Sequence, residues 1–364
     1  VPASSVHLQF AHGLTDRQYG QVFIPQLLFA IGGALLAGPV VKRLSLKSMY
    51  LVALVAFGLS QTALALSARV DPSLVLPMIM TATGLFGFGF GFGGGPLNGL
   101  VAELYPRTSA SAITGLHLMA GIGLMLGPLY FRAFESQGWW IWAPMLLVVA
   151  AVVLLVTAKV ILQGRTPTAP ISPSAVPARS AYFWLMIVIA FLYALVEGAF
   201  SNWAVIFVTI EKSATRDAGA VALAAFWAGL TLGRLATTLR VERIGVQRLW
   251  MVLPAMMIVA FLILPTLESE TALILGFSFA GLACSAFFPL MVAVAAGPFP
   301  EHISWIASML TASLMCGVGV GSYVIGDAAS EIPIARMYLY FAWVPVFTLS
   351  LMWLSGRFRP RPFV

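Results

Sequence analysis

Long apolar stretches separated by short polar gaps run along nearly the whole chain. A helix that crosses a bilayer needs roughly 20 consecutive, mostly apolar residues. Eleven stretches come close to this length, and each predicts one membrane-spanning helix. They are residues 22–41, 49–68, 74–101, 109–131, 140–162, 181–209, 218–239, 249–267, 271–297, 303–326 and 334–355. The glycine-rich stretch 74–101 also allows a kinked or broken helix, because membrane helices tolerate glycine and proline.

One polar gap is much longer than the others. Residues 163–180 are rich in proline, serine and threonine, a composition typical of a flexible linker. The linker has five predicted spans before it and six after it. We therefore divide the chain into an N-terminal bundle (1–162), a linker (163–180) and a C-terminal bundle (181–364).

The composition agrees with this pattern and excludes a water-soluble domain. Hydrophobic residues make up 60% of the chain and charged residues only 9%, whereas a soluble domain carries about 25% charged residues. The two cysteines, Cys284 and Cys316, lie inside apolar stretches. We expect them to be packing residues, without a disulfide or a metal cluster.

The basic residues predict the orientation of the chain in the membrane. The formal net charge is +7, which in a soluble protein would favour a nucleic-acid partner. Here 14 of the 20 lysines and arginines fall in gaps on one side, and 6 fall on the other. Because the richer side faces the cytoplasm, we expect the linker and the C-terminus inside and Val1 outside. The expected location is a bacterial inner membrane, and no nucleic-acid partner is expected.

The two halves of the chain share short sequence matches in the same order. The sequence LMAGIG at 118–123 recurs as LMCGVG at 314–319, and the basic segment 42–46 recurs at 242–246. The spacing of the two pairs is nearly equal, which predicts a duplicated unit, although chance matches between apolar runs are the alternative. If the halves correspond, the first half lacks one span at its start, and eleven of twelve expected spans are visible.

These features resemble the major facilitator superfamily, whose members have a duplicated six-span unit and a long inner linker. The family carries a loop of the type G-x-x-x-D-R-x-G-R-K after its second span, and here Arg43 and Lys47 match it. Lys42 replaces the acid, which puts the usual charge contact between helices in doubt. The resemblance implies an all-α integral membrane protein of two pseudo-symmetric helical bundles. It also implies cytoplasmic gating loops that contain Arg43, Lys47, Arg234, Glu242 and Arg243.

Three stretches further resemble the bacterial sugar–proton symporters of the fucose permease type. They are residues 97–106, 116–123 and 193–234. Fucose permease has a proton-linked aspartate in its first span and a glutamate in its fourth. The first is absent here, and the fourth span has no acid before Glu103. The resemblance implies sugar transport coupled to protons.

Glu197 is the acid that falls near the middle of a predicted span. An acid at that depth costs about 2.5–3.5 kcal/mol on insertion scales, so it needs a partner, an inward position or a proton. It is our main candidate for proton coupling, and a structural hydrogen bond between helices is the alternative. His117 is the second candidate, because a histidine exchanges protons near neutral pH; its alternative is a bond to a neighbouring helix.

Several other polar side chains are candidates to line a substrate cavity. Asn202 lies about 140° around a regular helix from Glu197, so either the two occupy opposite edges of a wide cavity or Gly198 bends the helix. Trp203 suits stacking on a sugar ring or a position at the membrane interface. The cavity candidates are Asn98, Asn202, Trp203, Gln26 and Gln61.

Glycines four residues apart predict close contacts between helices. The glycines with this spacing are Gly87, Gly91, Gly95, Gly123, Gly127, Gly317 and Gly321. We find no catalytic or metal-ligand motif, and His7 and His12 alone make a poor metal site. We therefore expect no enzyme activity and no cofactor.

Two functions fit the sequence. The first is a secondary carrier for a small polar solute, a sugar or related metabolite, which works by alternating access and is driven by protons. The second is a non-transporting membrane subunit or assembly factor built on the same fold. In that case another membrane chain would occupy the place of the missing first span. The bilayer, the solute and protons are the partners of the first; a bound partner helix would identify the second.

Overall fold

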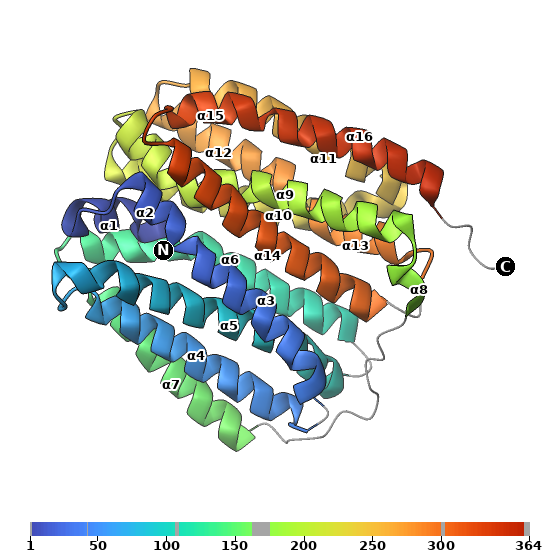
Figure 1. The fold of residues 1–364 in the computed structure, drawn as a ribbon, viewed down its shortest axis with the longest axis horizontal. Coiled ribbons are helices and arrows are strands. Elements are labelled where there is room, and N and C mark those ends of the chain that lie inside the picture. Colours follow the sequence, from blue (N-terminus) through green and yellow to red (C-terminus); the bar gives the residue numbers. More distant parts are fainter. Residues whose placement is uncertain (1, 42, 106–108, 162–174, 300–302, 360–364) are drawn as a thin grey trace. The chain divides into compact units, whose positions relative to one another are not determined.

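The computed structural model describes residues 2–41, 43–105, 109–161, 175–299 and 303–359. Figure 1 shows a chain built of helices, and the described ranges contain no strand. Within these ranges, eleven helical segments are long and apolar enough to cross a membrane. They are Asp16–Ala37, Leu46–Leu66, Pro72–Val101, Gly115–Glu135, Trp142–Ile161, Ala181–Glu211, Arg216–Thr237, Val246–Thr266, Glu270–Ala296, Ile306–Ala328 and Ile334–Phe358. The predicted all-α membrane fold and its eleven spans are confirmed.

The described part of the chain forms two compact units. Unit 1 holds residues 7–120 and 130–161, and unit 2 holds residues 2–6, 121–129 and 175–359. Much of the predicted linker 163–180 lies outside the described residues, so the predicted domain boundaries stay a prediction. The main part of unit 2 begins with the short helix α8 (Ala175–Ala178).

Unit 1 contains the helices of the first half of the chain. They are α1 (Ser5–His12), α2 (Asp16–Gln21), α3 (Phe23–Val40), α4 (Leu46–Leu66), α5 (Pro72–Leu104), α6 (Ser109–Glu135) and α7 (Trp142–Ile161). The short 3-10 turn Pro2–Ser4 that precedes α1, the first two residues of α1 and residues 121–129 of α6 belong to unit 2. The glycine-rich stretch forms one continuous helix, α5, in spite of Pro77 and Pro96 within it. The alternative of a broken helix is therefore not realised.

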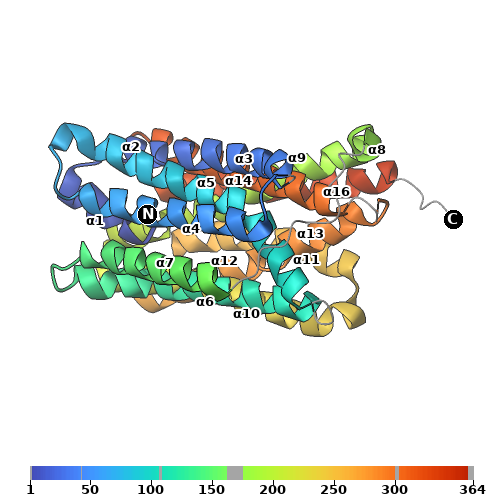
Figure 2. The ribbon, with the colours of Figure 1, turned by 90° about the horizontal axis from the view of Figure 1, so that it is seen from below.

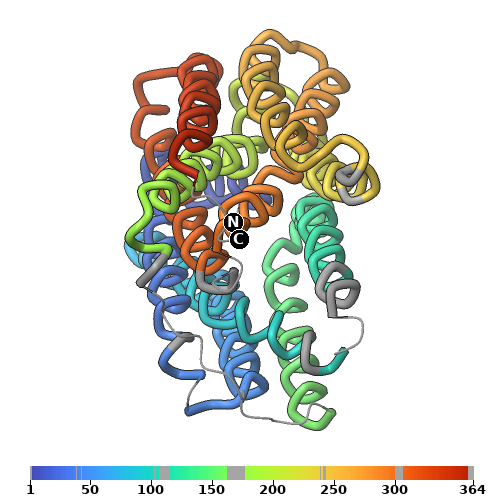
Figure 3. Tube along the Cα trace, turned by 90° about the vertical axis from the view of Figure 1, so that its right-hand side faces the viewer, coloured from blue at the N-terminus to red at the C-terminus, as the bar shows by residue number. Residues whose placement is uncertain are grey.

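Unit 2 contains the helices of the second half, which Figure 3 shows nearly end-on. They are α9 (Ala181–Ile206), α10 (Arg216–Ile244), α11 (Val246–Ile263), α12 (Glu270–Cys284), α13 (Phe287–Ala296), α14 (Ile303–Ala328), α15 (Ile334–Phe341) and α16 (Trp343–Phe358). α9 continues into a π-helical turn, Phe207–Glu211. Two of the spans of unit 2 are interrupted, one between α12 and α13 and one between α15 and α16.

The order in which helices pack is the same in the two units. In unit 1, α3 packs on α5, and α4 packs on α5 and α7, as the side view in Figure 2 also shows. In unit 2, α10 packs on α12, and α11 packs on α12 and α16. Each unit therefore repeats one scheme of neighbours, which supports the duplication inferred from the sequence.

Apolar side chains cover the outer surface of the helices as well as the core. α7 shows this most clearly, since its side chains Leu146, Val149, Val153 and Val156 are between 46% and 57% exposed. A water-soluble monomer rarely exposes a continuous apolar face of this kind. A surrounding bilayer accounts for it, because lipid tails solvate apolar side chains.

Glycines let particular helix pairs approach closely. A Cβ added at Gly87 or Gly91 of α5 would collide with the backbone of Gln26 or Ala30 on α3. In unit 2, Gly317 and Gly321 of α14 lie in the same way against Phe191 and Leu195 of α9.

The remaining glycines with this spacing have open surroundings. At Gly95, Gly123 and Gly127 an added Cβ would meet no atom within 4 Å. The four-residue spacing therefore identifies close helix contacts at some of these positions, and it does not by itself distinguish them from exposed ones.

These contacts predict opposite effects for two substitutions on one helix. Gly91→Ala should destabilise unit 1, because α3 and α5 must move apart, and overpacking of this kind costs about 1–3 kcal/mol. Gly95→Ala is the matched control, and we expect no loss, since alanine favours a helix over glycine by about 1 kcal/mol. Thermal unfolding of the purified protein in detergent measures both. Equal melting temperatures for the two variants would contradict the packing.

Candidate functional site

The span Glu270–Ala296 is broken in its second half. α12 ends at Cys284 and α13 begins at Phe287. Pro289 stands four residues after Ser285 and has no N–H group, so the Ser285 carbonyl lacks its ordinary helical donor. The break therefore leaves carbonyl oxygens inside an apolar span, where an unpaired polar group is costly.

Side chains from two other helices donate to these carbonyls. The Nε of Arg234, on α10, donates to the Ser285 oxygen at 2.9 Å. The Tyr193 hydroxyl, on α9, donates to the Cys284 oxygen at 2.8 Å. The helix break is thus held by α9 and α10 at adjacent residues.

Small and aromatic residues position these two donors. A Cβ added at Gly233 would collide with the Ser285 side chain, so glycine lets α10 approach the break. The Tyr193 ring stacks on Phe287, with ring centroids 4.7 Å apart and an angle of 20°. Because Tyr193 is only 1% exposed, its hydroxyl is fixed in place.

Glu197 lies one turn after Tyr193 on α9 and joins this group. Side chains four residues apart share one face of a helix, so the Glu197 carboxyl lies on the Tyr193 side of α9, where it also feels the positive charge of Arg234. We call Tyr193, Glu197, Arg234 and the carbonyls of Cys284 and Ser285 the Glu197 cluster. A carboxyl in this setting has a cation nearby when ionised and a hydroxyl partner when protonated, so it can hold or release a proton inside the span.

Asn202 and Trp203, predicted to line a cavity, lie inside unit 2. The Asn202 Nδ2 donates to Ser322 Oγ on α14 at 2.6 Å, and its side chain is 6% exposed. Trp203 is 0% exposed, so it is not an interfacial residue. Of the two alternatives for Asn202, a bend at Gly198 finds no helix interruption to support it, because α9 is continuous there and Gly198 lies against Val318 of α14.

The candidates in the first half of the chain lie on different helices. Gln26 on α3 and Gln61 on α4 are half-buried, and His117 on α6 is exposed. The Asn98 Nδ2 donates to the Gly94 oxygen one turn earlier on α5 at 2.9 Å, while its Oδ1 is buried without a hydrogen-bond partner. A role of these residues in a substrate cavity stays a prediction.

The basic residues assigned to gating loops take different positions. Arg43 is exposed in the turn between α3 and α4, whereas the Lys47 Nζ donates to the Lys159 oxygen at 2.8 Å and joins α4 to the end of α7. Arg234, Glu242 and Arg243 lie on α10, which continues to Ile244, and the side chain of Glu242 is outside the described residues.

The assignment of Arg234 to a loop is therefore wrong. No residue that would end the helix occurs before Gly245, whose φ of 89° turns the chain. Arg234 instead lies within the span Arg216–Thr237, at the helix break described above.

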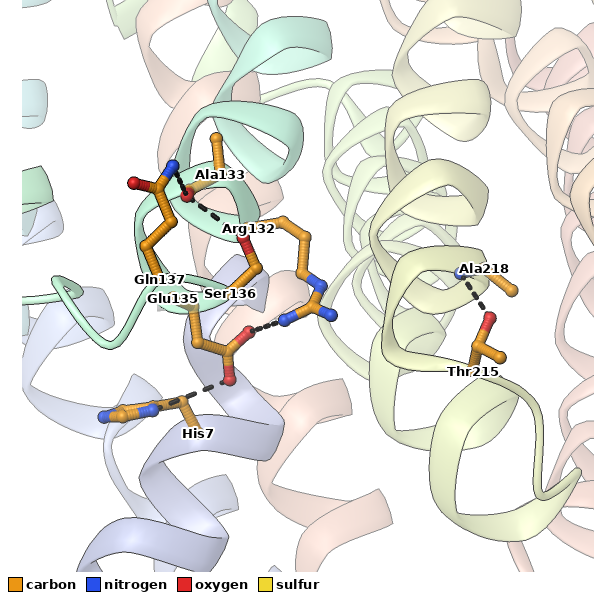
Figure 4. Close-up of polar contacts among 8 residues, drawn as sticks. All are labelled: His7, Arg132, Ala133, Glu135, Ser136, Gln137, Thr215 and Ala218. Atoms are coloured by element: carbon orange, nitrogen blue, oxygen red, sulfur yellow. Dashed lines mark hydrogen bonds and ion pairs between the residues drawn. The ribbon is translucent and has the colours of Figure 1, made fainter.

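A second group of polar side chains lies at one end of unit 1, and Figure 4 shows it. His7 Nδ1 lies 3.6 Å from Glu135 Oε1, and Arg132 Nη1 lies 3.2 Å from Glu135 Oε2. In the same turn, Ser136 Oγ and Gln137 Nε2 both donate to the Ala133 oxygen. Figure 4 also draws the start of α10 in unit 2, where Thr215 Oγ1 accepts the Ala218 N–H.

His12 lies beside this group. Its ring centroid is 6.2 Å from that of His7 and 5.9 Å from that of Trp140. Among the residues that the structure describes, no group of three or more histidine, cysteine, aspartate or glutamate side chains suits a metal ion.

The surroundings of His12 predict a dependence of stability on pH. Burial, and next the neighbouring His7, lower the pKa of His12 below its usual 6.5. The folded protein therefore binds this proton less well than the unfolded chain, so stability is highest above pH 6.5 and falls as the pH decreases below it. We expect His12→Gln to reduce the drop in melting temperature between pH 7.5 and pH 5. A drop equal to that of the unmodified protein would contradict this assignment.

Comparisons with known proteins agree with the helical architecture. A sequence profile described as the Major Facilitator Superfamily matches residues 1–267. No curated protein sequence matches the chain. A crystal structure of a D-xylose-proton symporter is similar, with a TM-score of 0.75 at 16% identity over 98% of this chain and 92% of the other. A crystal structure of the nucleoside transporter NupG has a TM-score of 0.78 at 14% identity, over 98% and 94% of the two chains.

Proposed function

The chain belongs to the major facilitator superfamily, and from this premise we propose that it carries a small polar solute across the membrane by alternating access in symport with protons. It is an integral membrane protein of a transporter family, which supports the prediction that it is not an enzyme. Its partners are the lipid bilayer and a small-molecule substrate. The proton and the class of solute are the proposed parts.

The Glu197 cluster is the observation that carries the proposal of proton coupling. Glu197 lies well inside the span Ala181–Glu211, where an isolated carboxylate is costly. The nearby Arg234 supports its ionised form, and Tyr193 supplies a hydrogen-bond partner. A carboxyl supported in both states is suited to accept a proton on one side of the membrane and to release it on the other.

The proposed substrate is a hydroxyl-bearing ring, either a sugar or a nucleoside. The two similar structures carry the names of a D-xylose-proton symporter and a nucleoside transporter, and the stretches that resemble fucose permease favour a sugar. Polar side chains such as Asn98, whose buried Oδ1 accepts no hydrogen bond, would suit a hydroxyl donor. The uneven placement of lysines and arginines in the gaps between spans supports a location in a bacterial inner membrane, with the linker and C-terminus in the cytoplasm.

Transport by the full chain in proteoliposomes tests this function. Counterflow of labelled pentoses, hexoses and nucleosides should identify one class that exchanges across the membrane. That solute should then accumulate above its external concentration when the outside is made acidic, and a protonophore should abolish the accumulation. Exchange without any response to the pH gradient would refute proton coupling. Exchange of no solute by folded protein would refute the carrier and favour the subunit.

A further inference from the structure

We propose that Tyr193 is a positioning residue that transmits the protonation state of Glu197 to the break between α12 and α13, and this inference rests on the proposed function. When Glu197 is protonated, Tyr193 fastens α9 to the Cys284 carbonyl. When Glu197 is ionised, Tyr193 releases that carbonyl. The proton would thereby control how firmly the broken span is held.

The Tyr193 hydroxyl has fewer protons to donate than it has acceptors around it. A phenol has one O–H to donate, and it also accepts hydrogen bonds. Two acceptors compete for that proton: the Cys284 oxygen at 2.8 Å, and the Glu197 carboxyl, which lies one turn along the same face of the continuous helix α9. The structure shows the donation to Cys284.

When Glu197 is protonated, the Glu197 carboxyl, the Tyr193 hydroxyl and the Cys284 carbonyl all form hydrogen bonds. The carboxylic acid donates to the Tyr193 oxygen, and Tyr193 donates to the Cys284 oxygen, so the two hydrogen bonds form a chain from α9 to the break. Hydrogen bonds in such a chain strengthen one another. The Cys284 carbonyl then has its donor in spite of the interrupted helix.

The ionised state of Glu197 changes the direction of the Tyr193 proton. A carboxylate has no proton to donate and is the stronger acceptor of the two, since hydrogen bonds to charged groups exceed those between neutral groups. The hydroxyl proton turns toward Glu197, and the Cys284 carbonyl loses its donor. The Tyr193 ring itself stays fixed by its stacking on Phe287, so only the proton has to rotate.

The neighbouring Arg234 is a constant link in both states. Its Nε donates to the Ser285 oxygen, and the guanidinium remains charged at every physiological pH. The proton on Glu197 therefore affects the contact at Cys284 and leaves the contact at Ser285. When Glu197 is protonated, Tyr193 and Arg234 both hold the break. When Glu197 is ionised, only Arg234 holds it.

Cys284 itself provides a measure of this change. The chain has two cysteines, so Cys316→Ser leaves one thiol, which is buried at the break. We would measure the rate of Cys284 alkylation by N-ethylmaleimide in proteoliposomes between pH 5.5 and pH 8. Each rate is divided by the rate for the same variant in denaturant at the same pH, which removes the pH dependence that an unfolded, freely accessible thiol shows by itself.

The expected results distinguish a tyrosine that responds to the protonation of Glu197 from one that only stabilises the fold. In the Cys316→Ser protein the normalised rate should rise by about tenfold with pH, the factor expected when one buried hydrogen bond is lost. Glu197→Gln should stay slow at every pH, because its amide donates to Tyr193 as the protonated acid does. Tyr193→Phe should be fast at every pH, because Cys284 then never has the donor.

Three outcomes would overturn the proposal. The first is a rise with pH that persists unchanged in Glu197→Gln, the second is a rise that persists in Tyr193→Phe, and the third is a flat profile in the Cys316→Ser protein. Thermal unfolding and a single monodisperse peak of the purified protein in detergent show that each variant is folded. The alkylation assay needs neither solute nor gradient, so failure of proton-driven accumulation would refute the proposed function separately, and a flat alkylation profile beside normal accumulation would refute only the role of Tyr193.

Discussion

Replacing Glu197 by glutamine is expected to abolish solute accumulation driven by a pH gradient and to leave exchange of the solute at equal concentrations intact. Glutamine keeps the size of the side chain and removes its titration. The variant therefore resembles the protonated carrier at every step of the transport cycle. With solute bound, it can still alternate between the states that are open to either side of the membrane. It cannot release a proton, so the gradient supplies no driving force.

Counterflow and gradient-driven uptake in the same proteoliposomes measure the two activities. Glu331→Gln is the matched control, because this carboxylate is exposed in the turn between α14 and α15, and it should retain both activities. Uphill uptake by Glu197→Gln at the level of the unmodified protein would remove Glu197 from the coupling mechanism. Loss of exchange as well would show that the residue is needed for solute binding or folding.

Replacing Arg234 by glutamine is expected to lower both stability and accumulation. Pro289 offers no N–H to the Ser285 carbonyl, so removal of the Arg234 donor leaves that oxygen unpaired inside the span. An unsatisfied buried group costs about 1–3 kcal/mol, which should appear as a lower melting temperature in detergent. The variant also removes the positive charge beside Glu197, so the ionised state that releases the proton becomes less favourable.

Two further variants separate these effects. Arg234→Lys keeps the charge and a donor, so it should recover part of the accumulation. Arg240→Gln removes an exposed arginine from the same helix, and it should change neither quantity. Full stability and accumulation in Arg234→Gln would show that the helix break does not need this donor.

The fold was predictable because the bilayer imposes one strong constraint on sequence. Each span needs about 20 apolar residues, and the predicted stretches 49–68 and 181–209 lie close to the observed spans Leu46–Leu66 and Ala181–Glu211. The glycine-rich stretch was ambiguous, because glycine is compatible with a straight or a kinked membrane helix. Packing against α3 and α4 resolves it as the continuous helix α5.

The candidate site was only half predictable. Glu197 was identified by its depth in the span, which sequence position gives directly. Tyr193 was missed, since a tyrosine in an apolar stretch gives no sign of its partner. Pro289 was a readable signal that the Ser285 carbonyl needs a new donor, but which helix supplies it depends on tertiary packing. Arg234 was predicted to lie in a loop because it was grouped with the nearby basic residues that match the loop motif of the family.

Asn202 and Trp203 show why residue type alone does not identify the partner of a buried side chain. Both lie one to two turns after Glu197 on α9, yet they face the interior of unit 2, where Asn202 bonds to Ser322. A buried polar group is satisfied either by a substrate or by a neighbouring helix, and the sequence does not distinguish these. The helical period predicted that Asn202 and Glu197 lie on different sides of α9. In the structure, the side that carries Asn202 packs against α14.

Proton movement that accompanies solute entry tests most directly whether Glu197 carries the coupling proton. Solute is added to lightly buffered proteoliposomes with no pre-existing gradient, and the external pH is recorded. We expect a transient alkalinisation outside with the unmodified protein, abolished by a protonophore and absent with Glu197→Gln. Solute entry without alkalinisation in the unmodified protein, or the same alkalinisation in Glu197→Gln, would contradict this expectation.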